Sequence, residues 1–349
     1  MDYRSLGPTG MMVSPLCLGA MMFGAWGEPD HDESTRIIHR ALDGGINVVD
    51  TADIYSRGES EEIVGKALEG RRDEVVLATK FHGPMDVDMG QTGNPLNRGN
   101  SRRWIVQEVE ASLRRLRTDW IDLYQVHRPE RETDVEETLA ALTDLQRQGK
   151  IRAFGCSTFP AADVVEAQGI SQRRGLGRFV TEQPPYSILA RGIEADLLPV
   201  TERYGMGVIP WSPLNGGWLT GRFRTGQDAP DNHRSRMRSS QYDLTRPENQ
   251  AKLEAAEALA VLAEETGVTL VHLALAFVMQ HPGVTAPIVG PRTMEQLETQ
   301  LGAVDVTLST DVLDRIDEIV PPGVNLARDD AGYLPPSLQD PFLRRRRTA

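Results

Sequence analysis

Four ionisable side chains stand at or just beyond the ends of three apolar runs in the first part of the chain. VVDTADIYSRGESEEIVG (48–65) ends its apolar run on Asp50 and carries Tyr55 five residues later. VVLATK ends on Lys80, and DLYQVH ends on His127. A tyrosine hydroxyl has a reference pKa of about 10, so it keeps its proton at neutral pH and can donate it. These residue types therefore suit protonation of the alkoxide that forms when hydride is delivered to a carbonyl.

The other three groups would support that proton transfer. An ammonium beside the phenol favours the phenolate and makes Tyr55 a better acid. Asp50 would pair with Lys80, which avoids an unpaired buried charge. His127 would hydrogen-bond the carbonyl oxygen and orient it. Taken singly, each residue has an ordinary alternative explanation: a loop cap, a solvated lysine or a structural histidine. Their grouping on consecutive strand ends favours the functional interpretation.

The elements that must position these residues are short apolar runs that alternate with amphipathic helical stretches. The runs are rich in Val, Ile and Leu rather than alternating, as in parallel strands covered on both faces. This pattern predicts an α/β fold, a (β/α)8 barrel, in which strand ends converge on one mouth. The predicted strands are 14–20, 46–52, 74–80, 121–127, 152–157, 179–183, 207–212 and 286–290; the predicted helices are 32–45, 60–70, 101–117, 135–148, 160–167, 193–204, 253–266 and 293–301.

Further elements are expected before the first and after the last β-α unit of the chain. The first twelve residues predict a hairpin, and 309–320 predict an extra C-terminal helix. We expect residues 1–330 to form a single barrel domain and 331–349 to be a flexible tail. Ser60 and Ser101 are predicted N-caps of the helices that begin beside them. Long loops at 81–100 and 213–250 follow the third and seventh strands, on the face where barrel active sites lie.

Composition narrows the function classes. The 349 residues carry a net charge of −12, which disfavours a nucleic-acid partner. The Arg344–Arg347 run is interpreted as a solvated tail rather than a nucleic-acid or membrane patch. Only Cys17 and Cys156 occur, and the apolar stretch 268–280 is too short to span a membrane. With no signal-peptide pattern at the N-terminus, a cytoplasmic protein without a membrane partner is expected.

The chain resembles the aldo-keto reductases over residues 1 to about 320. The resemblance is carried by GINVVDTADIYSRGESEEIVG (45–65), VLATK and DLYQVHRPE. It implies that Asp50, Tyr55, Lys80 and His127 form a catalytic tetrad with Tyr55 as proton donor. The closest branch would be the bacterial and potassium-channel β-subunit-like one. His127 nevertheless argues against the channel subunits themselves, in which an Asn takes that position.

The resemblance also implies a nicotinamide dinucleotide cofactor, since the tetrad holds no redox group. No Rossmann or Walker motif is present. IVGPRTMEQLETQLGAV (288–304) resembles the family's phosphate segment instead, and Arg292 there would bind a 2′-phosphate and favour NADPH over NADH. The implied cofactor-binding residues are Ala20, Met21, Asp50, Ser157, Thr158, Gln183, Trp211, Ser212, Leu214, Gly217, Arg222, Gly290, Arg292, Gln296 and Gln300, with Arg234 as a further candidate.

The predicted function is therefore NADPH-dependent reduction of aldehydes or ketones to alcohols. The substrate is a small-molecule carbonyl compound, and an oligomer is possible. Thr158 replaces the Asn of the family's usual Ser-Asn pair at the nicotinamide amide. Alternatives are a non-catalytic NADPH-binding sensor, an enzyme that runs mainly as an alcohol dehydrogenase, and a metal-dependent barrel hydrolase, which the lack of a metal-ligand motif disfavours. The predicted pocket-wall residues are Met22, Phe23, Trp26, His82 and Trp104.

Overall fold

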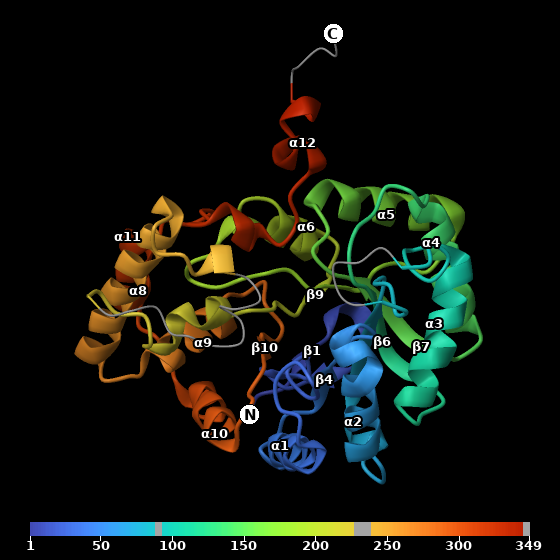
Figure 1. Cartoon of the computed structure of the whole chain (residues 1–349), viewed down its shortest axis with the longest axis horizontal. Helices are drawn as coiled ribbons and strands as arrows, with labels where there is room; N and C mark the ends of the chain where they lie inside the picture. The colour runs from blue at the N-terminus through green and yellow to red at the C-terminus, as the bar shows by residue number, and fades with distance from the viewer. Residues whose placement is uncertain (88–92, 227–238, 345–349) are drawn as a thin grey trace.

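The computed structural model describes residues 1–87, 93–226 and 239–344, and within them eight parallel strands form one curled sheet. The sheet order is β10-β3-β4-β5-β6-β7-β8-β9, so chain order runs steadily around it. A helix follows each strand and packs outside the sheet (Figure 1), which confirms the predicted (β/α)8 barrel. The strands are β3 (Cys17–Gly19), β4 (Val48–Asp50), β5 (Val76–Phe81), β6 (Ile121–Val126), β7 (Ile151–Cys156), β8 (Thr181–Glu182), β9 (Gly207–Val208) and β10 (Ile288–Val289).

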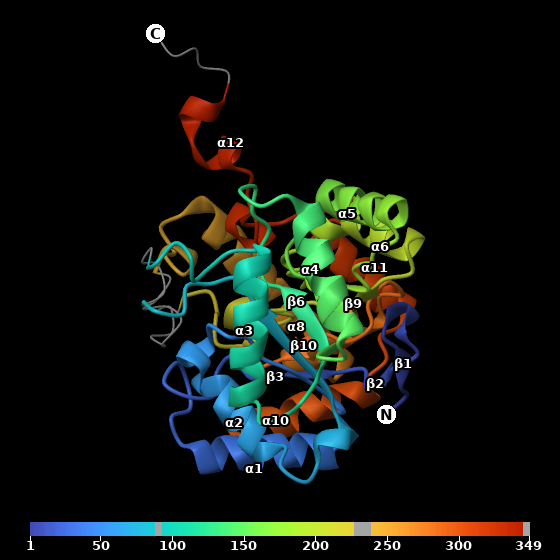
Figure 2. The same ribbon diagram turned by 90° about the vertical axis from the view of Figure 1, so that its right-hand side faces the viewer.

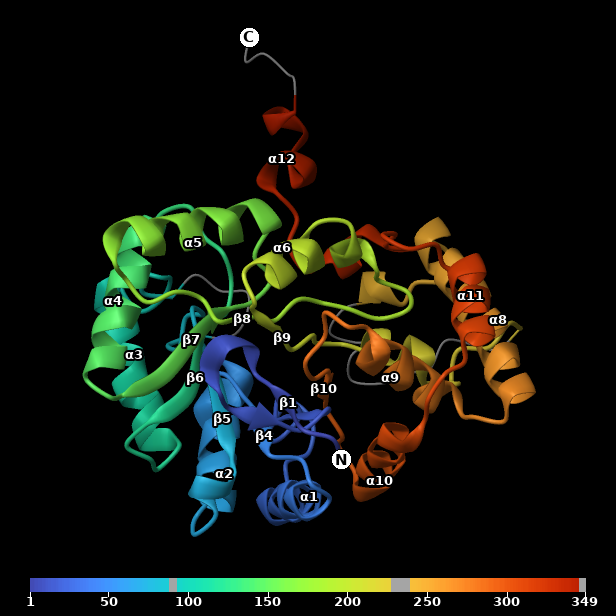
Figure 3. The ribbon, with the colours of Figure 1, turned by 180° about the vertical axis from the view of Figure 1, so that it is seen from behind.

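Most helices on the outside match the predicted ones, with shifted ends, whereas the helices at 270–280 and 336–339 were not predicted. The loop after β9 leads into two helices, α8 and α9, before β10. Seen from behind in Figure 3, α3 to α5 cover one side of the barrel, and α8 and α11 lie on the other. The helices are α1 (His31–Asp43), α2 (Glu59–Ala67), α3 (Arg102–Arg115), α4 (Val135–Arg147), α5 (Ala161–Arg174), α6 (Leu197–Arg203), α8 (Pro247–Thr266), α9 (Leu270–Gln280), α10 (Met294–Leu301), α11 (Thr310–Ile319) and α12 (Pro336–Gln339).

One of the two predicted serine caps is wrong. Ser101 does cap α3, because its hydroxyl accepts from the Trp104 backbone N–H at 3.4 Å. Ser60 lies inside α2, whose N-cap position is Gly58. The Ser60 hydroxyl instead donates to the Ala20 carbonyl at 2.8 Å and lies 2.9 Å from the Thr51 hydroxyl. Its role is to join the loops after β3 and β4, because it is fully buried between them.

The two ends of the sheet meet and close the barrel. The backbone N–H of Thr285 donates to Val208 O at 2.8 Å, and that of Ile288 donates to Pro210 O at 2.8 Å. These bonds connect the β9 edge to the β10 edge. The sheet therefore leaves no open edge at this point, and all eight strand ends face one mouth.

The barrel interior is apolar at its N-terminal end. The predicted hairpin is present as the antiparallel pair β1 (Arg4–Ser5) and β2 (Met12–Val13), and it covers that end. Leu6 and Val13 of the hairpin pack with inward-facing strand residues. This cluster comprises Leu6, Val13, Cys17, Val48, Ala78, Leu123, Ala153, Ile209 and Ala286. We call this cluster the apolar floor of the barrel, because it lies below the side chains at the mouth.

The C-terminal segment runs over the opposite end of the barrel. α11 corresponds to the predicted extra helix, and the chain then crosses the loops after β8, where Leu326 N–H donates to Leu189 O at 3.1 Å. α12 projects away from the barrel in the views of Figure 1 and Figure 2. Residues 345–347 of the arginine run lie outside the described part of the chain. No single helix in the described part is long and apolar enough to cross a membrane, although the bent pair α8–α9 passes that test jointly.

Candidate active site

A polar layer lies one pleat above the apolar floor. Side chains alternate along a strand, so the residue two positions beyond an inward-facing one also faces inward. Val48, Ala78 and Leu123 of the floor are thus followed by Asp50, Lys80 and Gln125. These three are almost completely buried. The switch from apolar to polar side chains therefore takes place inside the barrel, just below its mouth.

Lys80 is the centre of this layer. Its ammonium donates to Asp50 Oδ2 at 2.6 Å, to the Thr51 carbonyl at 2.8 Å and to the Tyr55 hydroxyl at 3.3 Å. Burial is the largest single influence and lowers the pKa of Lys80, but the charge interactions and hydrogen bonds with Asp50 and Tyr55 together outweigh it, and the net pKa is raised. Lys80 thus stays charged while buried, which is the state needed beside a phenol that gives up a proton.

Asp50 is held from two further sides. Its Oδ1 accepts from Gln125 Nε2 at 3.2 Å and from Gln183 Nε2 at 2.8 Å. With Lys80 on the other oxygen, both carboxylate oxygens are satisfied. These contacts orient Asp50, and Asp50 in turn fixes the ammonium of Lys80.

Tyr55 comes from the short 3-10 turn after β4 (η2, Tyr55–Gly58). Its ring meets the His127 ring edge-on, with centroids 5.7 Å apart and planes at 83°. The Trp26 ring lies on another side, with its centroid 6.1 Å away. Ser56 and Arg57, which follow Tyr55, both have positive φ, at 47° and 58°. A positive φ strains the backbone of any residue other than glycine, and residues strained in this way are found mostly at functional sites.

His127 is uncharged at neutral pH. Desolvation lowers the pKa of His127 well below 6.5, and the charges of Arg128 and Lys80 and the neighbouring His82 lower it further. A neutral imidazole carries one N–H donor and one acceptor. A neutral His127 can therefore offer a hydrogen bond to a carbonyl oxygen placed beside the Tyr55 hydroxyl.

The loop after β7 brings further polar side chains close to Asp50. Ser157 Oγ donates to the Gln183 carbonyl at 2.9 Å and lies 3.3 Å from Thr158 Oγ1. Thr158 has φ of 64°, a strained value that turns the loop. Buried Glu182 holds this turn from below, because its Oε1 accepts from the Phe159 N–H at 3.1 Å. The predicted residues Ser157, Thr158 and Gln183 are thus brought together with Asp50.

The loop after β9 supplies the next group of predicted residues. Trp211 pairs with Pro185 as an isolated bridge, and Arg128 Cζ lies 5.9 Å from its ring centroid. Ser212 and Asn215 have positive φ, at 57° and 47°, so the chain bends sharply here. The loop then passes through the 3-10 turn η5 (Asn215–Thr220). Leu214 and Gly217 are partly buried in this loop, and Arg222 is exposed just beyond it.

The segment after β10 carries the residues that the sequence predicts for phosphate and adenine binding. Thr293 caps α10 by accepting from Gln296 N–H at 3.3 Å, and Gln296 Oε1 accepts from Arg292 N–H at 2.9 Å. Gly290 is exposed where β10 ends. At the other end of α10, Gln300 is buried, and its Oε1 has no hydrogen-bond partner among the described residues. An unpaired buried acceptor fits a ligand N–H such as the adenine amine, so these residues suit a dinucleotide.

Comparisons with known proteins agree with this fold. The model of the family described as Aldo/keto reductase family matches residues 15–321. The chain belongs to the aldo/keto reductase family. It is 40% identical over 330 residues to the uncharacterized oxidoreductase YrpG of Bacillus subtilis, covering 92% of this chain and 96% of that protein.

Two other relatives in this family carry more specific names. A probable voltage-gated potassium channel subunit beta of Arabidopsis thaliana is 34% identical over 327 residues, covering 92% of this chain and 97% of the relative. Versiconal hemiacetal acetate reductase of Aspergillus parasiticus is 34% identical over 343 residues, covering 91% of this chain and 96% of the relative. The relatives thus include both an oxidoreductase branch and a channel-subunit branch of the family.

The early-loop residues of this family member divide into packing and mouth positions. Met22, Phe23 and Trp104 are buried, and Phe23 and Trp104 belong to the core between sheet and helices. Trp26 is partly exposed beside Tyr55, and partly exposed His82 bonds to Asn100 Oδ1 at 3.0 Å. Ala20 is buried and Met21 partly exposed after β3.

Arg234 lies outside the described residues. Within them, no group of three or more His, Cys, Asp or Glu side chains is placed to hold a metal ion.

Two residues at this site were missed by sequence reasoning. Gln125 binds Asp50, and Arg128 donates to Thr158 Oγ1. Gln125 had a detectable signal, because it is a polar residue two positions before His127 in an otherwise apolar strand and must share its face. The sequence held no such signal for Arg128, because an arginine that follows a strand is usually solvated.

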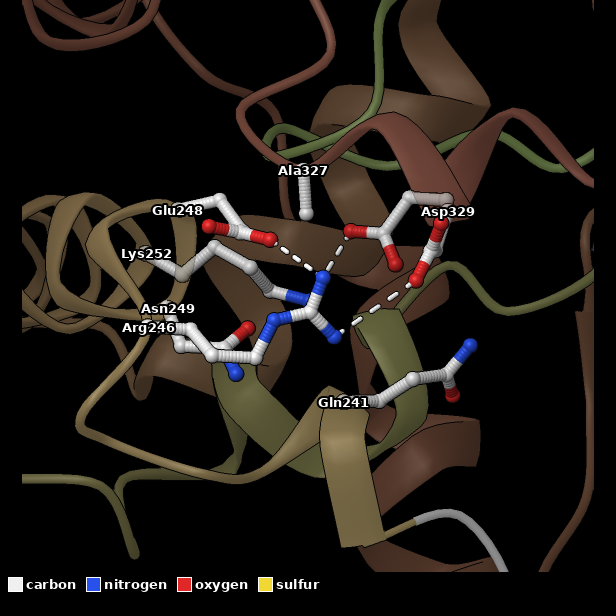
Figure 4. Close-up of a pocket in the computed structure, with 8 residues that line it drawn as sticks. Gln241, Arg246, Glu248, Asn249, Lys252, Ala327 and Asp329 are labelled. Carbon is white, nitrogen blue, oxygen red and sulfur yellow. Dashed lines mark hydrogen bonds and ion pairs between the residues drawn. The ribbon is translucent and has the colours of Figure 1, made fainter. Parts of the chain in front are cut away.

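A polar cluster joins the loop after β9 to the C-terminal segment. Asp330 accepts from the buried Lys252 ammonium at 2.9 Å and from Asn215 Nδ2 at 3.1 Å. In Figure 4, the Arg246 guanidinium reaches toward Glu248 and Asp329, and it lies 3.7 Å from the latter. Two residues after Asp330, a β-carbon at Gly332 would lie 2.7 Å from Thr158 Cγ2 and 2.9 Å from Trp211 Cζ2. The C-terminal segment is thus packed directly on the mouth.

Proposed function

We propose that this protein reduces aldehydes or ketones to alcohols with NADPH, and that Tyr55 donates the proton. The observation that carries the proposal is the position of the Lys80 ammonium, 2.6 Å from the Asp50 carboxylate and 3.3 Å from the Tyr55 hydroxyl. A fully buried ammonium between a carboxylate and a phenol is the arrangement that makes tyrosine a general acid.

Each side chain has one task in this proposal. NADPH supplies the hydride when it is bound. His127 donates a hydrogen bond to the carbonyl oxygen and holds it beside the phenol. Tyr55 transfers its hydroxyl proton to that oxygen as negative charge develops there. Lys80 stabilises the phenolate that remains, and Asp50 keeps Lys80 in place.

NADPH would extend from the β7 loop to α10. Ser157, Thr158 and Gln183 would hold the nicotinamide amide, with Trp211 stacked on the ring. Gln300 would accept from the adenine amine, and Arg292 would pair with the 2′-phosphate. That charge is the reason to propose NADPH rather than NADH.

A second candidate is an NADPH-binding sensor without turnover. The relatives described as potassium channel subunits beta support it, at 34% identity over nearly the whole chain. His127 and the Lys80 contacts favour the reductase. A third possibility, an enzyme that works mainly as an alcohol dehydrogenase, uses the same residues in reverse.

The deciding experiment follows NADPH absorbance with a panel of reactive aldehydes. We expect the wild type to oxidise NADPH, and Tyr55→Phe to lower kcat by about 10²- to 10⁴-fold, the usual contribution of a general acid. The Kd for NADPH should stay within about threefold, since the hydroxyl is not a proposed cofactor contact. Tight NADPH binding with no turnover on any carbonyl would favour the sensor.

A further inference from the structure

A second buried polar network lies on the outer side of the sheet, behind the candidate active site. Ala78 and Lys80 of β5 face the barrel interior, so Thr79 between them faces the layer between the sheet and the helices. The Thr79 hydroxyl donates to Glu61 Oε1 of α2 at 2.6 Å, and both residues are completely buried. The strand that carries Lys80 is thus joined to α2 by a hydrogen bond outside the barrel.

Arg115 of α3 extends this network to the turn that carries Tyr55. Its Nε donates to the other Glu61 oxygen, Oε2, at 2.6 Å. The Arg115 side chain also packs against Gly58, where a β-carbon would lie 2.6 Å from Arg115 Cδ. Gly58 is the last residue of η2, the turn that begins at Tyr55. The network therefore connects β5 with η2 through one residue of α2 and one of α3.

The turn η2 needs such support, because its backbone is strained. Ser56 and Arg57 have positive φ, and Gly58 follows them with φ of 91°. Strained residues keep their conformation only where the surrounding structure holds them. Arg115 is itself held close to α2, because a β-carbon at Gly65 would lie 2.6 Å from Arg115 O. The position of the turn, and of the phenol at its start, therefore depends on where Arg115 is placed.

Neutralising the charge of Arg115 does not require Glu61. The Arg115 guanidinium also donates to Glu108. Burial raises the pKa of Asp53, and the charges of Glu108 and Glu61 raise it further, although Arg115 opposes them. Asp53, Glu61 and Glu108 thus interact with one cation, which is more carboxyl groups than neutrality needs. The contribution of Glu61 is instead geometric, because it accepts from Thr79 and from Arg115 at the same time.

We propose that Glu61 is a positioning residue that sets the distance between the Lys80 ammonium and the Tyr55 hydroxyl from behind the sheet. That distance is 3.3 Å, and the two side chains come from the two elements that Glu61 and Arg115 connect. Loss of the connection lets the phenol move away from the ammonium, and a misplacement of about 1 Å can cost a reaction about 100-fold in rate. This inference rests on the proposed reductase function and adds to it a residue outside the barrel interior.

The test compares variants at two adjacent positions of α2. Glu61→Met removes both hydrogen bonds of Glu61 but leaves Arg115 paired with Glu108. Glu61→Gln can keep both bonds, because its amide oxygen accepts from Arg115 and its amide nitrogen donates to the Thr79 hydroxyl oxygen. Glu62→Met is the matched control, because it removes a carboxylate from an exposed position one residue further along the same helix.

The measurement is the rate of a single turnover. Each protein is saturated with NADPH and mixed with 4-nitrobenzaldehyde, and the oxidation of bound NADPH is followed by absorbance, so that product release does not contribute. We expect Glu61→Met to lower this rate by about 10- to 100-fold without a matching change in the Kd for NADPH. Glu61→Gln and Glu62→Met should stay close to the wild-type rate.

A double variant separates positioning of the phenol from a general loss of structure. If Glu61 acts through the Tyr55 hydroxyl, Glu61→Met should lower the rate of Tyr55→Phe far less than it lowers the rate of the wild type, because the group that it positions is already gone. A general structural defect would lower both rates by the same factor. Circular dichroism of each variant identifies a folding defect.

Three results would overturn the inference: a wild-type rate in Glu61→Met, the same rate loss from Glu61→Met in the wild-type and Tyr55→Phe backgrounds, or an equally large loss in Glu61→Gln or Glu62→Met. If Glu61→Met fails to fold, Thr79→Val and Thr79→Ser replace it. The valine lacks the hydroxyl that bonds to Glu61 and should lower the rate, whereas the serine retains it; equal rates in these two variants would overturn the inference.

Failure of the reductase proposal itself looks different. In that case the wild type oxidises NADPH neither with 4-nitrobenzaldehyde nor with any other carbonyl of the panel, and the inference about Glu61 is overturned with it. A wild type that turns over the aldehyde, combined with a Glu61→Met variant that does so equally well, refutes the role of Glu61 alone.

Discussion

At the scale of single residues, the site depends on the Lys80 ammonium staying charged although burial disfavours a charge. Lys80 is completely buried, yet its ammonium is matched by Asp50, and Asp50 is matched by Gln125 and Gln183. Removing one member of a buried ion pair leaves an uncompensated charge, which costs far more than the pair contributes. The same contacts that would tune Tyr55 therefore also bear on the stability of the barrel interior.

This reasoning gives a prediction for Lys80→Met. The variant leaves the Asp50 carboxylate buried and unpaired, so we expect the free energy of unfolding to fall by about 3–5 kcal/mol. Adding Asp50→Asn removes the unpaired charge and should restore a large part of that loss, without restoring carbonyl reduction. Urea denaturation of the wild type, the two single variants and the double variant gives the values. Additive losses in the double variant would contradict the pairing argument.

At the scale of elements, the site depends on how closely β7 and β8 approach each other. A β-carbon at Gly155 would lie 2.0 Å from Thr181 Oγ1 and 2.9 Å from Thr181 O. Ser157 follows Gly155 by two residues, and Gln183 follows Thr181 by two. Glycine at this position therefore lets the two strand ends bring Ser157 and Gln183 within hydrogen-bond distance.

We accordingly predict that Gly155→Ala forces β7 and β8 apart. Overpacking of this kind costs about 1–3 kcal/mol, and NADPH affinity should fall with it because Ser157 and Gln183 separate. The control is Gly169→Ala in α5, where the nearest atom to a new β-carbon is the mobile Arg173 side chain at 3.3 Å. That change should leave NADPH binding intact and stabilise the helix by up to about 1 kcal/mol. Calorimetric titration with NADPH and urea denaturation check both; unchanged affinity in Gly155→Ala would refute the argument.

At the scale of the whole molecule, one buried carboxyl links folding stability to pH. Burial raises the pKa of Glu182 from 4.5 to about 8, against the lowering effect of hydrogen bonds from Cys156 and nearby backbone N–H groups. The folded chain therefore binds this proton more tightly than the unfolded chain. The contribution of Glu182 to stability is present in full below about pH 4.5 and is lost as the pH rises to about 8.

The predicted test is Glu182→Gln, measured by urea denaturation at several values from pH 5 to pH 8. In the wild type, Glu182 should make the free energy of unfolding fall by up to about 1.4 kcal/mol per pH unit in that window. The variant lacks this proton linkage, so its stability relative to wild type should rise steadily from pH 5 to pH 8. Other titrating groups are common to both proteins and cancel in the difference. Parallel curves would show that Glu182 titrates normally.

The sequence by itself determined the eight β-α units and the identity of the groups at their strand ends. Apolar runs and helical periodicity are local properties, and the parallel order of a barrel follows from them, so Asp50, Lys80 and His127 could be assigned to one mouth. Ser60 shows where local reasoning fails: a serine at a helix start suggests a cap, but a partner from the β3 loop was available.

Only the tertiary structure decided which of these groups touch. Gln125 and Gln183 are 75 and 133 residues from Asp50 in the chain, and they share its Oδ1 because the closed barrel brings their strands to one interior layer. Arg128 meets Thr158 and Trp211 for the same reason. Hydrogen bonds and charge interactions act over a few ångströms, and the spacing of residues along a sequence does not give those distances. They are set by the strand register and by closure of the sheet.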